Sequence, residues 1–161
     1  MDAYTAVHVA LSLVGILTGL VVLAGLLTRR WRPVWNATFL ATTALTSLTG
    51  YGFPVHQLLP SHIIGALSLV VLALAAFALY GRKLAGGWKR AYIFSAVLAL
   101  YFNVFVLVVQ AFLRVPALHA LAPTQAEAPF AVAQIAVLLI FMAAVAVACA
   151  RASGWTAYGH A

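Results

Sequence analysis

The stretch YTAVHVALSLVGILTGLVVLAGLLTRRWRP, Tyr4 to Pro33, decides the class of this chain. Its first part, Tyr4–Leu27, contains no charged residue, and three arginines follow within the next few positions. An α-helix rises about 1.5 Å per residue, so about 20 apolar residues cross the hydrocarbon core of a bilayer. The stretch therefore predicts a helix that crosses a membrane and ends in a basic loop.

The composition extends this prediction to the whole chain. Of the 161 residues, 66% are hydrophobic and 7% are charged, whereas soluble domains carry about 25% charged residues. The apolar runs do not alternate with polar residues, as strands of a membrane barrel would. We predict an all-α, single transmembrane domain with five spans, near residues 4–27, 34–53, 62–80, 91–113 and 129–150. The second span is diluted by threonine and serine, which favours a helix held among other helices.

The basic residues predict an orientation. If five helices cross in turn, eight of the nine lysines and arginines fall on one side, and only Arg114 falls on the other, with both acids. Basic residues in short loops stay in the cytoplasm. The N-terminus is then outside and the C-terminus inside, in the inner (plasma) membrane of a bacterium. The net charge of +7 is explained by topology, and nucleic-acid binding is not expected, because no basic face or motif is present.

Polar residues fall on single faces of the predicted helices. His8, Ser12, Gly15 and Gly19 are separated by four, three and four positions, and Gly15 and Gly19 form a GxxxG pair that allows close helix packing. Asn103, Gln110 and Arg114 share a face of the fourth helix, and Gln134 lies on the fifth. A polar group that faces lipid stays unpaired at a cost. We therefore expect these faces to point into the bundle.

The turn TGYGFPVHQLLPSHIIG, Thr49 to Gly65, carries His56 and His62 and has no charge, and Pro54 and Pro60 bracket its central part. Proline fixes φ, so the turn is expected to be stiff. Ser61 is a suitable N-cap for the third helix. The turn therefore indicates the wall of an outward-facing site.

The sequence is compatible with several ligands or roles for this site. Haem b would take His8 and His62 as ligands, with Ser12 beside them and room for the macrocycle at Gly15 and Gly65. A copper or other transition metal ion would use His56, His62 and His119. A path for a small polar solute or an ion would be lined by Asn103, Gln110, Arg114 and Gln134. The last alternative is a non-catalytic accessory subunit of a larger membrane complex, or a homo-oligomer.

Catalysis by this chain alone is not favoured. The sequence contains no Ser/His/Asp set, no phosphate-binding glycine loop, and only two acids, Asp2 and Glu127. A single cysteine, Cys149, excludes an internal disulfide and a CxxC pair. No catalytic residues are assigned.

Two resemblances add to these expectations. The segments FLATTALTSLTGYGFPVHQLLPSHIIGALSLVVLALA, VLALYFNVFVLVVQAF and VPALHALAPTQAEAPF resemble a group of small, uncharacterised multi-pass inner-membrane proteins of proteobacteria. This group implies a membrane location and no particular activity. The placement of His8 and His62 at the starts of two helices is similar to that in membrane cytochrome b-like proteins, which implies haem ligation. The chain departs from those families because their ligands usually lie deeper, and because the His-Arg or His-Lys pairs that bind the propionates are absent here.

Overall fold

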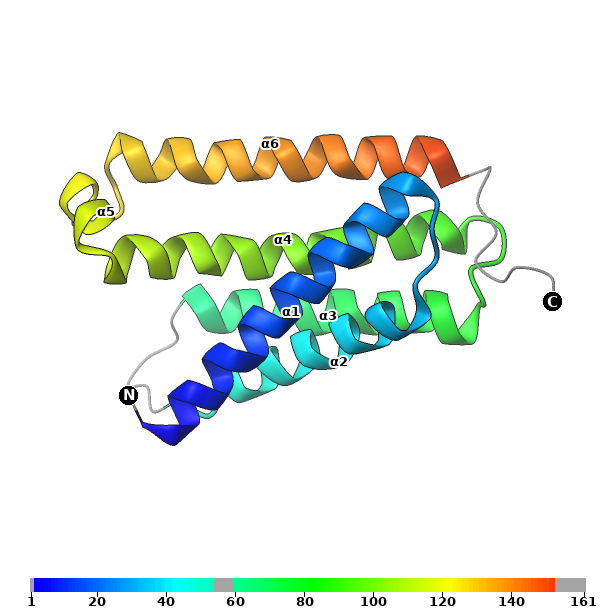
Figure 1. Ribbon diagram of the computed structural model, residues 1–161, viewed down its shortest axis with the longest axis horizontal. Coiled ribbons are helices and arrows are strands. Elements are labelled where there is room, and N and C mark those ends of the chain that lie inside the picture. The colour runs from blue at the N-terminus through cyan, green and yellow to red at the C-terminus, as the bar shows by residue number, and fades with distance from the viewer. Residues whose placement is uncertain (1, 54–59, 153–161) are drawn as a thin grey trace.

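The protein is an all-helical bundle, seen in a computed structural model that describes residues 2–53 and 60–152, with side chains from residue 63 onward in the second range. No strand occurs in these two ranges. In chain order the helices are α1 (Ala3–Thr28), α2 (Pro33–Gly50), α3 (Pro60–Ala76), the π-helical turn η1 (Phe77–Gly81), α4 (Trp88–Arg114), α5 (Pro116–Leu121) and α6 (Ala128–Arg151). Figure 1 shows α4 and α6 side by side, with α1 crossing the bundle obliquely.

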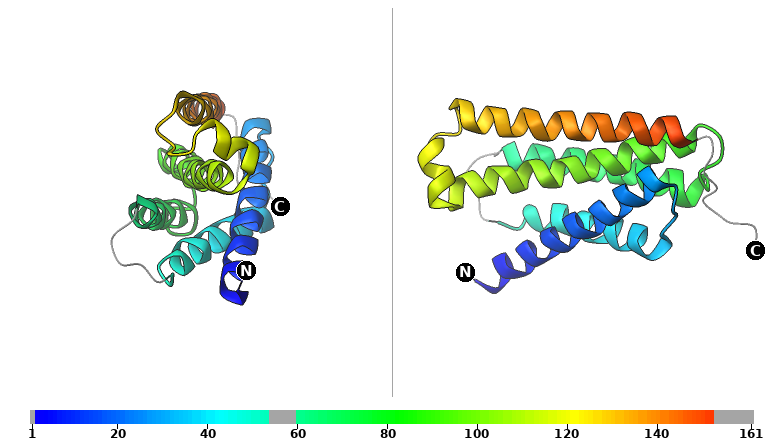
Figure 2. Two further views of the ribbon diagram at one scale, coloured as in Figure 1. Left: turned by 90° about the vertical axis from the view of Figure 1, so that its left-hand side faces the viewer. Right: turned by 45° about the horizontal axis from the view of Figure 1, so that its top comes forward.

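The helices alternate in direction, so the connections gather at two ends of the molecule (Figures 1 and 2). The α1–α2 loop, the η1–α4 loop and the end of α6 share one end, and the Nη1 atom of Arg151 donates to the Leu27 carbonyl there at 2.7 Å. We call this the basic end, because its basic residues are Arg29, Arg30, Arg32, Arg82, Lys83, Lys89, Arg90 and Arg151. The opposite end, called the His8 end, carries Asp2, Arg114 and Glu127. The predicted separation of charge is therefore a property of the fold.

Four helical segments of the described chain are long and apolar enough to cross a membrane: α1, Ile63–Gly81, α4 and α6. The protein is therefore a multi-pass membrane helix bundle. The second predicted span corresponds to α2, which is not among the four and whose 18 residues are rich in threonine. Three of its hydroxyls bond to carbonyls of the preceding turn: Thr38 to Val34 at 2.9 Å, Thr42 to Thr38 at 2.7 Å and Thr49 to Leu45 at 2.8 Å. Such back-bonding lowers the cost of placing hydroxyls in an apolar medium.

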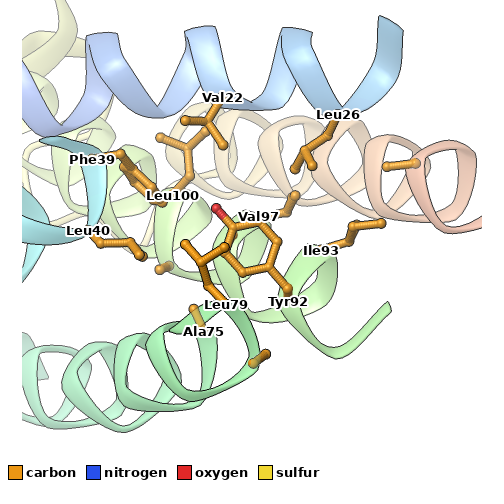
Figure 3. Close-up of a cluster of buried hydrophobic side chains, with 14 of the residues drawn as sticks. Val22, Leu26, Phe39, Leu40, Ala75, Leu79, Tyr92, Ile93, Val97 and Leu100 are labelled. Carbon is orange, nitrogen blue, oxygen red and sulfur yellow. The ribbon is translucent and has the colours of Figure 1, made fainter. Parts of the chain in front are cut away.

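The predicted glycine packing of α1 is confirmed. Gly15 and Gly19 are buried, and a methyl group added at Gly19 would lie 2.5 Å from Leu100 Cδ1 and 2.9 Å from the Phe39 ring. Phe39 of α2 and Leu100 of α4 meet beneath α1 in the core (Figure 3). The absence of a side chain at Gly19 thus allows three helices to approach one another.

The boundaries differ from the expected ones in three places. α2 ends at Gly50, and α3 begins at Pro60, so Ser61 lies inside the helix and the prediction that it is the N-cap is wrong. The third span ends in η1, where the amide of Arg82 bonds to the Phe77 carbonyl at 2.9 Å. The short helix α5 was not expected; Pro116 occupies its first position, where a proline loses no helical hydrogen bond.

Candidate functional site at the His8 end

His8 lies in the second turn of α1 and is held by two contacts from the end of α2. Its Nδ1 atom lies 2.8 Å from the Oγ1 atom of Thr49. Its ring meets the Phe53 ring edge-to-face, with centroids 5.1 Å apart and planes at 88°. The ring is half-buried, so both its position and its tilt are fixed.

The hydrogen bonds around Thr49 assign the proton on His8. The Thr49 hydroxyl also lies 2.8 Å from the Leu45 carbonyl, which can only accept. Thr49 therefore donates its proton to Leu45 and accepts from the Nδ1–H group of His8. In a neutral imidazole the other nitrogen, Nε2, then carries the lone pair. This is the tautomer in which histidine binds a metal through Nε2 while its other N–H group is held by a protein acceptor.

Tyr4 contacts the same two residues, Thr49 and Phe53, that hold this histidine. Its hydroxyl donates to the backbone carbonyl of Thr49 at 2.5 Å, and its ring meets Phe53 edge-to-face with centroids 5.1 Å apart. Gly52 faces the Tyr4 hydroxyl, so a side chain at position 52 would collide with it. The end of α2 is thus joined to the first two turns of α1 through Thr49.

Polar side chains continue from this point between α1 and α2. The Ser12 hydroxyl, one turn below His8, donates to the His8 carbonyl at 2.9 Å. On α2, one turn from Thr49, the Oγ1 atom of Thr46 is buried and has no hydrogen-bond partner in the described part of the chain. Most other hydroxyls of these helices bond to the preceding turn, so Thr46 is an exception.

Asn103 forms the inner limit of this polar zone. Its Nδ2 atom donates to Oγ1 of Thr43 at 3.2 Å, and Thr43 is fully buried. One turn deeper, Gly19 packs against the apolar side chains of Phe39 and Leu100. These polar side chains therefore extend from the His8 end toward the middle of the bundle.

The glycine positions expected to cradle a macrocycle are filled by neighbouring side chains. A methyl group at Gly15 would lie 3.2 Å from Oγ1 of Thr43 and 3.5 Å from Nδ2 of Asn103. At Gly65 it would lie 3.4 Å from the Tyr51 hydroxyl. Both glycines therefore face side chains of neighbouring helices.

The fourth helix does not present its whole polar face inward. Asn103 points toward α2, as expected, but Gln110 and Arg114 are exposed, and the expectation that they face the bundle is wrong. Because α1 crosses obliquely (Figure 2), it does not cover this part of α4. The two side chains pair with each other instead, Arg114 Nε donating to Gln110 Oε1 at 3.0 Å.

Gln134 lies on a different side of α4 from Asn103. It reaches from α6 and donates through Nε2 to the Phe105 carbonyl at 3.2 Å, while its Oε1 atom is buried without a partner in the described ranges. It therefore joins α6 to α4. The expected path lined jointly by Asn103, Gln110, Arg114 and Gln134 is not assembled.

The structure describes only some of the other histidines that were predicted to be ligands. His119 is exposed on α5, with Nδ1 3.3 Å from the Phe112 carbonyl. His56 and the side chain of His62 lie outside the described residues, although the backbone of His62 belongs to the first turn of α3. Among the described side chains, no three or more His, Cys, Asp or Glu residues form a group that could hold a metal ion. Neither the His8–His62 pair nor the His56–His62–His119 set is tested.

At the His8 end, Asp2 caps the start of α1, and Glu127 is held by the loop that precedes α6. Asp2 accepts from the backbone amide of Thr5 at 2.7 Å, and this bond lowers the pKa of its carboxyl. Glu127, which precedes α6, accepts from the hydroxyl of Thr124 at 2.8 Å, and this bond lowers its pKa as well. These carboxylates have local structural partners.

One buried polar pair was not expected from the sequence. Near the basic end, the Tyr92 hydroxyl donates to Oδ1 of Asn36, and Nδ2 of Asn36 donates to the Arg32 carbonyl at 2.7 Å. Asn36 is 2% exposed and Tyr92 is fully buried, with its hydroxyl directed toward the α1–α2 side (Figure 3). The two residues are 56 positions apart, and no periodic pattern connects them.

Comparisons with protein-family models, curated proteins and solved structures find no match for this chain.

Proposed function

We propose that this membrane protein holds a redox-active metal centre at its His8 end, with Nε2 of His8 as one ligand. We further propose that the chain crosses the inner membrane of a bacterium five times, with the His8 end outside. The basic loops support this orientation. The course of α2 supports a fifth crossing, because α1 ends at the basic end and α3 begins at the His8 end. At 1.5 Å per residue, α2 extends about 27 Å.

The observation that carries the metal centre is the contact of His8 with Thr49. The Thr49 hydroxyl donates its proton to the Leu45 carbonyl and accepts the Nδ1–H group of His8 at 2.8 Å. The lone pair of His8 is therefore on Nε2, which is free to bind a metal. Metal-binding histidines almost always have such an acceptor on the second nitrogen. The Phe53 ring packs against the imidazole and gives the ligand an apolar neighbour.

Two centres would use this ligand. Haem b would take His62 as the second axial ligand and would supply one-electron chemistry. Gly15 and Gly65, which were expected to leave room for it, face Thr43 and Tyr51. A copper ion would need no such space and would take His56, His62 and His119 as further ligands.

Absorption spectroscopy and metal analysis of the protein purified from its native membrane test this proposal. We expect stoichiometric iron or copper, and its loss in His8→Ala. A Soret band would identify haem, and copper without a Soret band would identify the ion. His119→Ala separates them further, since only the copper site should weaken. Metal-free wild-type protein, or a metal content unchanged in His8→Ala, would refute the role of His8.

A second candidate function is that of an accessory subunit in a larger membrane complex. It is favoured by α6, of whose most apolar 18-residue window only 6% is buried. Its exposed apolar residues include Val132, Ile135, Leu139, Ile140 and Met142. Extraction from the native membrane in a mild detergent should then recover stoichiometric partner chains. Recovery of this chain alone would exclude such a complex.

A further inference from the structure

A surface hollow at the basic end combines an apolar wall with two arginines. It lies on the side of α1 and is lined by Val21, Ala24, Gly25, Thr28, Arg30 and Arg32. Val21 and Ala24 belong to the last turns of α1, and the arginines belong to the loop that follows. Apolar and cationic groups thus meet where a membrane-spanning helix ends.

The shape of the hollow is fixed by the way α1 ends. Arg29 has a left-handed conformation, with φ of 60°, which turns the chain back over the helix. The amide of Arg30 then bonds to the Gly25 carbonyl at 2.8 Å. A methyl group at Gly25 would lie 2.6 Å from the Arg30 carbonyl oxygen and 3.9 Å from Cδ of Arg32. Glycine at position 25 therefore allows the loop to bring both arginines alongside α1.

The buried pair of Asn36 and Tyr92 holds the other end of this loop. Both the amide and the Nδ2 atom of Asn36 donate to the Arg32 carbonyl, at 3.0 and 2.7 Å, and Tyr92 of α4 donates to Asn36 Oδ1. The ring of Trp31 packs edge-to-face on Tyr92, with centroids 5.9 Å apart. The position of Arg32 is therefore determined by the core of the bundle.

The arginines have no acidic partner in this chain at this end. Asp2 and Glu127 are the only acids of the sequence, and both lie at the His8 end. Cations in basic pockets at the ends of membrane helices attract anionic lipid headgroups, at about 1 kcal/mol per Lys or Arg. Arginine suits phosphate in particular, because its planar guanidinium can donate two parallel hydrogen bonds to it.

We propose that this hollow binds an anionic phospholipid. The phosphate lies between Arg30 and Arg32, and an acyl chain runs along Val21 and Ala24 toward the middle of the membrane. The apolar wall distinguishes a lipid from a free phosphate, which would gain nothing from it. This site is independent of the metal centre, which belongs to the opposite end.

A second hollow at the basic end provides a matched control. It is lined by Gly86, Gly87, Lys89, Arg90 and Ala152 and lacks an apolar helix wall. The nearby Lys83 is exposed and belongs to the same loop. Replacing Lys83 and Arg90 by glutamine removes the same charge from the same end, without touching the first hollow.

The test measures lipid binding to the purified, detergent-solubilised protein by native mass spectrometry and by thermal stabilisation. We expect phosphatidylglycerol to bind and to raise the midpoint of unfolding, and phosphatidylcholine and inorganic phosphate not to do so. The Arg30→Gln/Arg32→Gln variant should lose affinity about thirty-fold, or about five-fold per arginine. The Lys83→Gln/Arg90→Gln variant should keep its affinity within about two-fold.

Three results would overturn the proposal. An equal loss in both double variants would show attraction by net charge alone. Stabilisation by inorganic phosphate equal to that by phosphatidylglycerol would show an anion site without a lipid. An unchanged affinity in Arg30→Gln/Arg32→Gln would show that the lipid binds elsewhere. If that variant folds poorly, Ala24→Gln, on the exposed apolar wall, should weaken binding while both arginines remain.

Discussion

Replacement of Gly19 by alanine tests the central packing of the bundle. The added methyl carbon would lie 2.5 Å from Leu100 Cδ1 and 2.9 Å from Phe39, whereas carbon atoms pack favourably at about 3.5–4.0 Å. Leu100 is 1% exposed and Phe39 is fully buried, so both side chains belong to the packed core and would have to shift within it.

Two terms oppose each other in this variant. Alanine is more favourable than glycine in a helix interior by about 1 kcal/mol, while overpacking a core costs about 1–3 kcal/mol. We expect Gly19→Ala to lower the free energy of unfolding by about 1 kcal/mol, and Gly19→Val by more because its side chain is larger. The control is Gly50→Ala, whose methyl group would meet only His8 Cε1 at 3.8 Å.

The free energy of unfolding would be measured in mixed micelles by titration with a denaturing detergent, with helix content followed by circular dichroism. Gly50→Ala should be as stable as the wild type or slightly more stable. A Gly19→Ala variant that gains as much stability as Gly50→Ala would show that α1, α2 and α4 do not meet at this glycine.

Three further outcomes are expected. In a background in which Cys149 is replaced by serine, a cysteine introduced at Ala126 should react with an impermeant thiol reagent added outside the cell. A cysteine introduced at Ala85 should not react. The reverse labelling pattern would show the opposite orientation. Because its pKa is lowered by Thr124 from the usual 4.5, Glu127 should stabilise the protein above that pH. This stabilisation should be lost as the pH falls through the lower folded pKa, and an acid-side melting curve unchanged by Glu127→Gln would contradict this. Tyr92→Phe should cost about 1–3 kcal/mol of unfolding free energy, because it leaves a buried Asn36 oxygen unpaired; a smaller loss in the same micelle assay would argue against the bond.

The sequence was sufficient for features that repeat along one helix. Apolar length predicted the membrane helices, and the spacing of Gly15 and Gly19 predicted a packed face, because both depend only on helix geometry. The separation of basic and acidic loops followed from counting the helices. Each of these features can be read from neighbouring positions of the chain.

Features that depend on the angle between helices were not predictable. Gln110 shares a face with Asn103 in the sequence, yet only Asn103 is covered, because α1 crosses α4 obliquely. The bond between Asn36 and Tyr92 joins residues from two hairpins. The hydrogen-bond partner of His8 could not be predicted either. Thr49 is one of several threonines in α2, and the register of α1 against α2 determines which of them lies beside His8.

The hydroxyl-rich α2 also has a consequence for biogenesis. A segment that is less apolar than its neighbours partitions poorly into lipid when it leaves the ribosome alone. Its contacts with α1, through Thr49 to His8 and Thr43 to Gly15, are formed by the segment synthesised immediately before it. We therefore expect α1 and α2 to enter the bilayer together as a hairpin. The hydrogen bond from Asn103 to Thr43 can form only after α4 has been translated. This contact of α2 therefore forms late, after the first three helices have been synthesised.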